Sequence, residues 1–364
     1  MTKILIATGG TGGHVYPAVV TAQELRRRGC QVVFIGTFGA AEEKIKDAGF
    51  DRVAIVSEGF VSRGILQKIA AVGAMVMAFG RCVQCMRSLR PDIVLGFGGY
   101  SSFPTVLAAF CCGVPAIVHE QNALPGQANK LLGMLVRRAA VGFKDAAGFF
   151  PKGKAVWTGN PLRPFDMLMS REQAHVELGL DVLKCTVLIF GGSQGSRAIN
   201  AHVVEVFSDI PQGVDVQVIH ITGKKDFEQV KDRYRMLGVS ALVREYMERI
   251  AVAYAAADLV IGRSGAGTVT ELGLLGVAAV LIPYPGARDH QKYNARVLER
   301  LGTASIIEEK CLRQDILRDK IFSQLRRDPS GILRAKNRDI LKNDFIVDGA
   351  ERLCDEVLKL AHAC

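Results

Sequence analysis

Long apolar runs and export signals are absent from the sequence. No run of about 18 consecutive apolar residues occurs, so we expect no segment that crosses a membrane. Met1-Thr2-Lys3 leads directly into an apolar, strand-like segment, without the apolar stretch and cleavage site of a secretory signal. The 9 cysteines are an odd number. We therefore expect reduced thiols in a cytosolic protein.

Patterns that mark zinc or dinucleotide sites are also absent. Cys82-x-x-Cys85 has no second pair and no nearby histidine at zinc spacing, so we interpret it as two positions on one helix face. The turn GGTGGH at 9–14 is not followed by Gly-Lys-Ser/Thr, which excludes a Walker motif. It also lacks G-x-G-x-x-G spacing with an acidic residue about 20 positions later, which disfavours a dehydrogenase.

The chain has enough apolar sequence for two domains. Its 364 residues exceed a typical single core, and 49% hydrophobic with 23% charged residues indicate a globular protein. The formal net charge of +10 favours an anionic partner. Charge alone does not distinguish nucleic acid, a phosphorylated metabolite and an anionic membrane surface.

Apolar runs alternate with helical stretches in the first half of the chain. The runs are continuous, which is typical of strands buried on both faces of a parallel sheet. Strands separated by helices predict a doubly wound α/β domain. The expected strands lie at 3–8, 31–36, 92–99 and 115–121, and a helix is expected at 15–28.

The same design restarts after a linker. Residues 157–165, WTGNPLRPF, carry two prolines and a glycine, which is typical of a domain junction. We predict two Rossmann-like domains, 1–160 and 161–344, and an amphipathic helix in the tail. Residues 186–200 repeat the apolar strand, glycine-rich turn and helix, and further strand-to-loop units are expected at 216–223, 259–272 and 278–285.

The first glycine-rich turn raises the question of His14. Glycines permit unusual backbone angles, and the helix after them offers unpaired N–H groups to an anion. His14 stands where that helix begins. It either closes the turn as a cap or faces a group that must lose a proton, and the residues alone leave both roles open.

Two later turns have the same strand–turn–helix form. Residues 191–196, GGSQGS, place Ser193 where a phosphate oxygen would reach a helix N-terminus. Residues 263–271, RSGAGTVTE, place Glu271 in the first turns of a helix, where its carboxylate can accept both hydroxyls of a ribose. The alternatives are a plain turn and helix-dipole stabilisation. A sugar nucleotide carries both the phosphates and the diol that these motifs suit.

Polar residues also follow two of the expected strands. His119-Glu120-Gln121-Asn122 ends one strand, and Asp289-His290-Gln291 follows another. Such clusters usually face a cleft, although Glu120 or Gln121 is expected to fix loops by hydrogen bonds. Arg163, at the junction, can reach a diphosphate or form an interdomain ion pair.

Residues 63–90 and 129–138 mix apolar and basic side chains. The pattern suits contact with anionic lipid, and helices facing the core with solvated arginines are the alternative. The first segment contains Ile65, Leu66, Ile69, Val72, Met75, Val76 and Phe79, with Arg63, Lys68, Arg81, Arg87 and Arg90.

The order of these motifs resembles the MurG family, the UDP-N-acetylglucosamine–N-acetylmuramyl-(pentapeptide) pyrophosphoryl-undecaprenol N-acetylglucosamine transferases. The resemblance covers nearly the whole chain. The matching motifs are GGTGGH at 9–14, GGYSSFP at 98–104, HEQNALPG at 119–126, GNPLR at 159–163, GGSQGS at 191–196, RSGAGTVTE at 263–271 and DHQ at 289–291.

The resemblance implies a GT-B fold, in which two Rossmann-like, doubly wound parallel-sheet domains face a central cleft. Domain 1–160 would hold the acceptor and associate with the membrane, with the tail helix 345–364 packing back on it. Domain 161–344 would bind UDP-N-acetylglucosamine (UDP-GlcNAc).

The resemblance also implies roles for single residues. His14 becomes the leading candidate for a catalytic base, with a purely orienting role as the alternative. Met247 would read uracil through its backbone, and a one-residue shift in alignment would exchange His290 for Gln291 as the sugar contact. The implied substrate-binding residues are Thr11, Gly12, Gly13, Asn122, Arg163, Ser193, Met247, Ala266, Gly267, Thr268, Val269, Thr270, Glu271 and Gln291.

The implied reaction moves N-acetylglucosamine from UDP-GlcNAc to the C4 hydroxyl of the MurNAc unit of lipid I, with inversion, giving lipid II for peptidoglycan synthesis. No metal or other cofactor is implied, since helix N-termini and Arg163 can balance the charge of UDP. The implied location is the cytoplasmic face of the inner membrane, as a peripheral protein. Partners would be the donor, lipid I, an anionic membrane surface and other cell-wall synthesis proteins.

Two rival functions remain at this stage. Another GT-B enzyme, such as a UDP-GlcNAc 2-epimerase, would release UDP without a lipid acceptor. A nucleic-acid-binding protein is suggested by the charge of +10. No array of interleaved aromatic and basic residues supports it, so no nucleic-acid partner is expected.

Overall fold

The computed structural model describes residues 1–9, 12–39, 42–55, 65–163, 169–192, 195–286, 289–325 and 332–363, with backbone alone for 65–72 and 332–333. The chain divides into two compact units. Unit 1 comprises residues 1–163 and 346–364, and unit 2 comprises residues 164–345.

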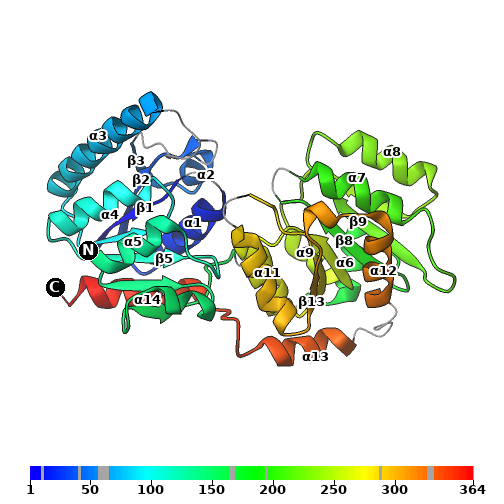
Figure 1. The fold of residues 1–364 in the computed structure, drawn as a ribbon. Coiled ribbons are helices and arrows are strands. Elements are labelled where there is room, and N and C mark those ends of the chain that lie inside the picture. The colour runs from blue at the N-terminus through cyan, green and yellow to red at the C-terminus, as the bar shows by residue number, and fades with distance from the viewer. Residues whose placement is uncertain are drawn as a thin grey trace. The chain divides into compact units, whose positions relative to one another are not determined.

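Unit 1 is built on a seven-stranded parallel sheet with the order β3-β2-β1-β4-β5-β6-β7 (Figure 1). Its elements are β1 (Lys3–Ala7), α1 (Gly12–Arg27), β2 (Gln31–Gly36), α2 (Glu42–Asp47), β3 (Asp51–Ala54), α3 (Ile65–Leu89), β4 (Ile93–Gly96), α4 (Ser102–Cys111), β5 (Ala116–Glu120), α5 (Gln127–Leu135), β6 (Arg138–Val141), the 3₁₀ helix η2 (Lys144–Phe149), β7 (Ala155–Trp157) and α14 (Gly349–Ala361).

Helices cover both faces of this sheet. In β1, Ile4 and Ile6 pack with α1 on one face, and Leu5 and Ala7 pack with α4 and α5 on the other. Helix α14, red in Figure 1, joins the α1 face through Leu353, Cys354 and Val357. Burial on both faces is the physical reason for continuous apolar strands in a parallel sheet.

Unit 2 is built on a six-stranded parallel sheet with the order β10-β9-β8-β11-β12-β13. Its elements are α6 (Arg171–Leu178), β8 (Cys185–Phe190), α7 (Arg197–Val206), β9 (Val216–Ile221), α8 (Phe227–Met236), β10 (Ala241–Arg244), α9 (Ile250–Ala256), β11 (Leu259–Gly262), α10 (Ala266–Leu275), β12 (Ala278–Leu281), α11 (His290–Arg300), β13 (Ala304–Ile306), η4 (Glu309–Cys311), α12 (Gln314–Leu325) and α13 (Ile332–Leu341).

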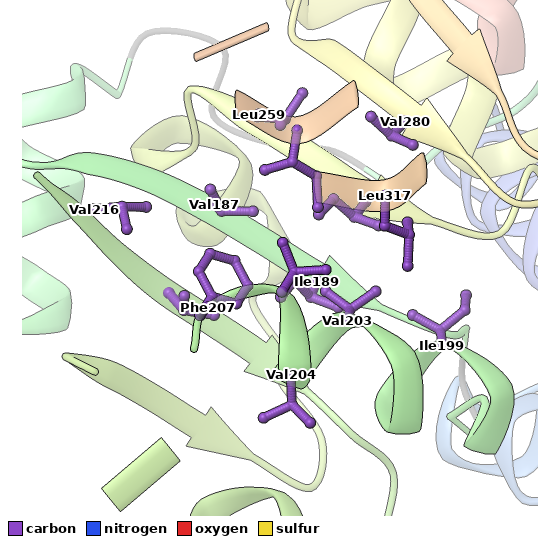
Figure 2. Close-up of a cluster of buried hydrophobic side chains, with 14 of the residues drawn as sticks. Val187, Ile189, Ile199, Val203, Val204, Phe207, Val216, Leu259, Val280 and Leu317 are labelled. Atoms are coloured by element: carbon purple, nitrogen blue, oxygen red, sulfur yellow. The ribbon is translucent and has the colours of Figure 1, made fainter. Parts of the chain in front are cut away.

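The core of unit 2 includes apolar side chains that pack against one face of its sheet. Figure 2 shows Val187 and Ile189 of β8 among Val203 of α7, Phe207 and Leu317 of α12. All five side chains are buried. This packing fixes β8 and the start of α7, and therefore positions the turn between them.

The predicted fold class, two doubly wound parallel-sheet α/β domains, is confirmed. One boundary differs, because α1 begins at Gly12 rather than at residue 15. The first four N–H groups of a helix have no acceptor within it, so the glycines at 12 and 13 form the first turn of α1 and still leave their N–H groups to a ligand. His14 consequently lies inside that turn. Among the described residues, no helix is long and apolar enough to cross a membrane.

Candidate active site

The candidate site of unit 1 lies where the strand order reverses. Strands β1 and β4 are neighbours in the sheet, but the chain leaves them in opposite directions, toward β2 and toward β5. Ligands of doubly wound sheets bind outside the carboxyl ends of the strands at such a point. The turns after β1, β4 and β5 meet there, and they carry His14, Gly99 and Gln121.

His14 is half-buried in the first turn of α1, and its Nδ1 lies 3.0 Å from Oε1 of Gln121. Gly99, with φ of +78°, brings its backbone to the other edge of the ring. A methyl group added at Gly99 would lie 3.7 Å from Cδ2 and 3.8 Å from Nε2 of His14. Within the described part of the chain, Nε2 of His14 has no hydrogen-bond partner.

Gln121 and His119 form the buried base of this site. The amide nitrogen of Gln121 donates to Phe97 O at 3.1 Å and contacts Nδ1 of His119 at 3.2 Å. Nε2 of His119 lies 3.1 Å from Gly159 O. Complete burial lowers the pKa of His119 to about 4, so this imidazole is neutral near pH 7.

Glu120 fixes the loop that follows β5. Its buried carboxylate accepts from the backbone N–H of Asn122 at 2.9 Å and of Gly126 at 3.0 Å. The side-chain amides of Asn122 and Asn129 also donate to it, at 3.1 Å and 2.9 Å. Asn122, one of the sequence-predicted site residues, is therefore held in one orientation at the carboxyl end of β5.

Arg163 is the last residue of unit 1, and its exposed guanidinium stacks on Tyr16 of α1, 4.1 Å from the ring centroid. Tyr16 also packs over Gly12, where an added methyl group would lie 3.0 Å from its ring. Gly13 is exposed in the same helical turn. Arg163 is thus placed beside the N-terminus of α1. Thr11, also predicted in this site, lies outside the described residues.

Unit 2 repeats the reversal of strand order between β8 and β11. The turn after β8 contains Ser193, which lies outside the described residues. The turn after β11 leads into α10, whose N-cap is Gly265 and whose first residues are Ala266, Gly267 and Thr268. Unpaired N–H groups at such a helix start suit an anion. Val269 and Thr270 are buried, so their side chains serve the core.

Glu271 lies one turn further along α10 and is half-buried. Its Oε2 accepts a hydrogen bond of 2.8 Å from the hydroxyl of Tyr254 on α9. Tyr254 is buried, and burial followed by the Glu271 charge raises its pKa well above the usual value. The phenol therefore stays protonated and orients the carboxylate.

The remaining predicted residues of unit 2 lie at the start of α11 and in the loop after β10. Gln291, on α11, accepts a 3.0 Å hydrogen bond from the N–H of Tyr284 at its Oε1, and its backbone oxygen accepts from Ser264. His290 begins α11. Met247 is half-buried in the loop after the edge strand β10.

Sequence reasoning missed the residues that hold these side chains. Tyr254 orients Glu271, Tyr16 supports Arg163, and Arg263 ties three loops together. The buried Arg263 donates to Ser196 Oγ at 2.8 Å and to Ile282 O at 3.1 Å, and it pairs with Glu309. The available signal was an arginine placed directly after a buried strand, where a charge requires partners.

Comparisons with known proteins agree with this geometry. The Glycosyltransferase family 28 N-terminal domain matches residues 4–141, and the corresponding C-terminal domain matches residues 186–353. A protein of Coxiella burnetii (strain Dugway 5J108-111) is 38% identical over 336 residues, 92% of each chain. Its name is UDP-N-acetylglucosamine--N-acetylmuramyl-(pentapeptide) pyrophosphoryl-undecaprenol N-acetylglucosamine transferase.

The chain belongs to the MurG family of glycosyltransferases. The crystal structure of Acinetobacter baumannii MurG is 28% identical, covers 99% of this chain and 100% of its own, and has a TM-score of 0.79. A UDP-GlcNAc 2-epimerase from Neisseria meningitidis, 15% identical with a TM-score of 0.67, shares the fold alone. The GT-B fold expected of the MurG family is thereby confirmed.

Family membership does not itself assign a role to each residue. The structure brings His14, Asn122 and Arg163 to the carboxyl edge of one sheet. At the carboxyl edge of the other sheet, Glu271 and Gln291 lie near the starts of α10 and α11, and Met247 lies in the loop after β10. Within the described ranges, no group of three or more histidine, cysteine, aspartate or glutamate side chains is placed to hold a metal ion.

Proposed function

We propose that this chain transfers N-acetylglucosamine from UDP-GlcNAc to the C4 hydroxyl of the MurNAc unit of lipid I, with inversion, forming lipid II. Its membership of the MurG family supports this function, as does 38% identity over 92% of the chain to a transferase of that name. The observation that carries the mechanism is His14, an imidazole with one nitrogen bonded to Gln121 and the other directed away from that bond, at the strand reversal of unit 1.

A single displacement accounts for the reaction. His14 Nε2 takes the proton of the acceptor hydroxyl as that oxygen attacks the anomeric carbon of the donor. The bond from the anomeric carbon to the phosphate oxygen breaks, and UDP leaves with the electron pair. One displacement turns an α-linked donor into a β-linked product.

The departing diphosphate requires positive charge and N–H donors. In the proposed site, Arg163 and Ser193 meet the diphosphate, and Thr11, Gly12, Gly13 and Asn122 line the donor-sugar side. The exposed guanidinium of Arg163 on Tyr16 supports this role. The backbone of Met247 reads uracil.

Helix α10 supplies the rest of the proposed donor site. Its first residues, Ala266 to Thr268, offer N–H groups to the nucleotide. Val269 and Thr270 are buried and support that first turn, and the N–H of Val269 donates to Gly265 O at 3.0 Å. Glu271, oriented by Tyr254, accepts the ribose hydroxyls. Gln291 contacts the sugar through its amide nitrogen, because its Oε1 is engaged by Tyr284.

The proposed location is the cytoplasmic face of the inner membrane, where lipid I would be met at an anionic surface together with other cell-wall synthesis proteins. Helices α3, α4 and α5 lie side by side, and they expose Val76, Met77, Phe110, Leu131 and Met134. Between residues 65 and 138 the acidic residues are Asp92 and Glu120 alone, against seven lysines and arginines. Apolar side chains among net positive charge suit the interface of an anionic bilayer.

The function is tested by following UDP release from UDP-GlcNAc with purified full-length protein. Release that requires a lipid I analogue is expected. UDP release without any acceptor would favour an epimerase, and no release with either a natural-length or a shortened lipid would contradict the proposal.

The membrane surface is tested with vesicles of phosphatidylglycerol and phosphatidylethanolamine. Met134→Glu, on α5, is expected to reduce sedimentation with these vesicles. Met236→Glu is the matched control, since Met236 is also an exposed methionine on a helix, α8 of unit 2. Equal sedimentation of both variants and the wild type would contradict the assignment.

A further inference from the structure

Two backbone carbonyls determine which way the side chain of Gln121 points. Its amide nitrogen lies 3.1 Å from Phe97 O and 3.3 Å from His119 O. A carbonyl oxygen can only accept a hydrogen bond, so the –NH₂ group must face these two atoms. The amide oxygen must then face the opposite side.

That opposite side holds His14. The Gln121 oxygen, 3.0 Å from Nδ1 of His14, can only accept, so Nδ1 carries the proton. In a neutral imidazole the other nitrogen then holds the lone pair, which places it on Nε2. The carbonyl oxygens of Phe97 and His119 thus orient the Gln121 amide, and the amide in turn determines which nitrogen of His14 carries the proton.

His119 agrees with the same orientation. Its Nε2 faces Gly159 O, which can only accept, so Nε2 carries the proton and Nδ1 accepts. The Gln121 amide has two hydrogens: one points to Phe97 O, and Nδ1 shares the other with His119 O. Gln121 and His119 are both buried, so bulk water does not compete for these bonds. Every hydrogen-bond donor of His14, Gln121 and His119 in this network then faces an acceptor. Reversing the Gln121 amide would place its oxygen against the carbonyl oxygens of Phe97 and His119.

We propose that Gln121 is a positioning residue that holds His14 in the Nδ1–H tautomer, so that Nε2 is available to take the acceptor proton. The proposal rests on the proposed function for its consequence in catalysis, but the tautomer itself is a property of the free protein. In the other tautomer the nitrogen beside Gly99 would carry a hydrogen and could not act as a base.

The tautomer is measured by ¹⁵N NMR of the full-length protein labelled at histidine nitrogen, with His14→Gln used to assign the His14 signals. In the wild type we expect a protonated Nδ1 and an unprotonated Nε2 for His14. A protonated Nε2 in the neutral ring would overturn the proposal. Because no substrate is present, this result is independent of whether the chain is a transferase.

Gln121→Met removes the acceptor and keeps the length of the side chain. We expect the Nδ1–H signal of His14 to lose its dominance, and kcat to fall by about 10–100-fold, less than loss of the base itself, while KM for UDP-GlcNAc changes by less than about twofold. An unchanged tautomer would overturn the proposal. A changed tautomer in a protein whose wild type shows no acceptor-dependent UDP release would count against the proposed function alone.

Gln217→Met is the matched control. Gln217 is also a buried glutamine, and it bonds Asp181 and Thr186 at the amino end of β9 in unit 2. Its loss should lower stability without moving the His14 signals. Should Gln121→Met fail to fold, the tautomer of His14 in the wild type still decides the question, because that measurement needs no variant at Gln121 and a protonated Nε2 in the neutral ring overturns the proposal.

Discussion

Units 1 and 2 each contain a buried histidine joined to an amide side chain, but the two networks end differently. In unit 1, His119 bonds Gln121, and Gln121 bonds the half-buried His14. In unit 2, Nε2 of His220 lies 3.1 Å from Oδ1 of Asn200, and Nδ1 lies 3.0 Å from the hydroxyl of Tyr234. The unit 2 network therefore ends on the hydroxyl of a buried tyrosine on one side and on the carboxylate of Asp226 on the other, and its imidazole stays buried.

The same chemistry thus serves two purposes. Asn200 is oriented by donating to Thr222 O at 2.9 Å, just as Gln121 is oriented by Phe97 O. In unit 2 the bonds connect α7, α8 and β9 around the buried His220, and the Asn200 amide also donates to the half-buried Asp226 at the N-cap of α8, at 2.8 Å. In unit 1 they reach an imidazole at the strand reversal. A buried polar network becomes chemically useful when one end of it reaches a surface where a substrate can bind.

The largest expected effect is a fall in kcat when His14, the half-buried end of the unit 1 network, is replaced. His14→Ala should lower kcat for acceptor-dependent UDP release by about 10²–10⁴-fold, the usual contribution of a general base. Calorimetry should show unchanged UDP-GlcNAc affinity. His202→Ala, at an exposed histidine bonded within α7, is the control and should leave kcat unchanged. An unchanged kcat in His14→Ala would remove the base assignment.

The next largest effect is on the stability of unit 2 when the hydrogen-bond network around His220 is broken. His220→Phe leaves the Tyr234 hydroxyl and the Asn200 oxygen without their partner in the core. Each buried group left unpaired costs about 1–3 kcal/mol, so unit 2 should lose about 2–6 kcal/mol in urea unfolding. kcat measured on folded protein should not change. A fall in kcat as large as that of His14→Ala would show that the two networks are not separate in function.

Acid should weaken the protein through the same buried histidines. Burial lowers the pKa of His119 to about 4 and of His220 to about 3, whereas unfolded histidines titrate near 6.5. The unfolded chain then binds protons that the folded chain does not, so this contribution to stability is complete above about pH 6.5 and is lost as the pH falls toward these values. Urea midpoints from pH 8 to pH 4 should show this decline, and His220→Phe should flatten it. An identical decline in that variant would contradict the assignment.

The smallest effect should come from a methyl group beside His14. Gly99→Ala strains a left-handed backbone and adds a methyl group 3.8 Å from Nε2 of His14, so kcat should fall several-fold. Gly113→Ala is the matched control, because Gly113 has φ of +73° and nothing within 4 Å of an added methyl group. Both should lose about 1–2 kcal/mol of stability, and equal kcat values for the two variants would contradict the placement of His14.

The central strands were predictable and the edge strands were not. β1 and β8 are continuous apolar runs because both faces are buried. The edge strands β3 (DRVA) and β10 (ALVR), and the short β7 (AVW), each have three or four residues that are mostly half-buried or exposed. Such segments contain no continuous apolar run, because an edge strand has a neighbouring strand on one side only and most of its side chains stay partly exposed.

The site was predictable as motifs but not as contacts. The glycine-rich turns located His14 and Glu271, and the expectation that Glu120 or Gln121 fixes a loop is met by both, Glu120 through Asn122 and Gly126. The bond from Gln121 to His14 depends on β1, β4 and β5 being neighbours in the sheet. Sequence periodicity identifies strands but not their order in the sheet, so it could not predict the hydrogen bond between Gln121 and His14. Tyr254 was missed for the same reason.

The configuration of the product tests the central claim most directly. The full-length protein is incubated with UDP-GlcNAc and a lipid I analogue, and the coupling constant of the new anomeric proton is measured by NMR. One displacement with His14 as base predicts a β-linked disaccharide on the lipid. An α-linked product, or UDP release without any disaccharide, would contradict the account.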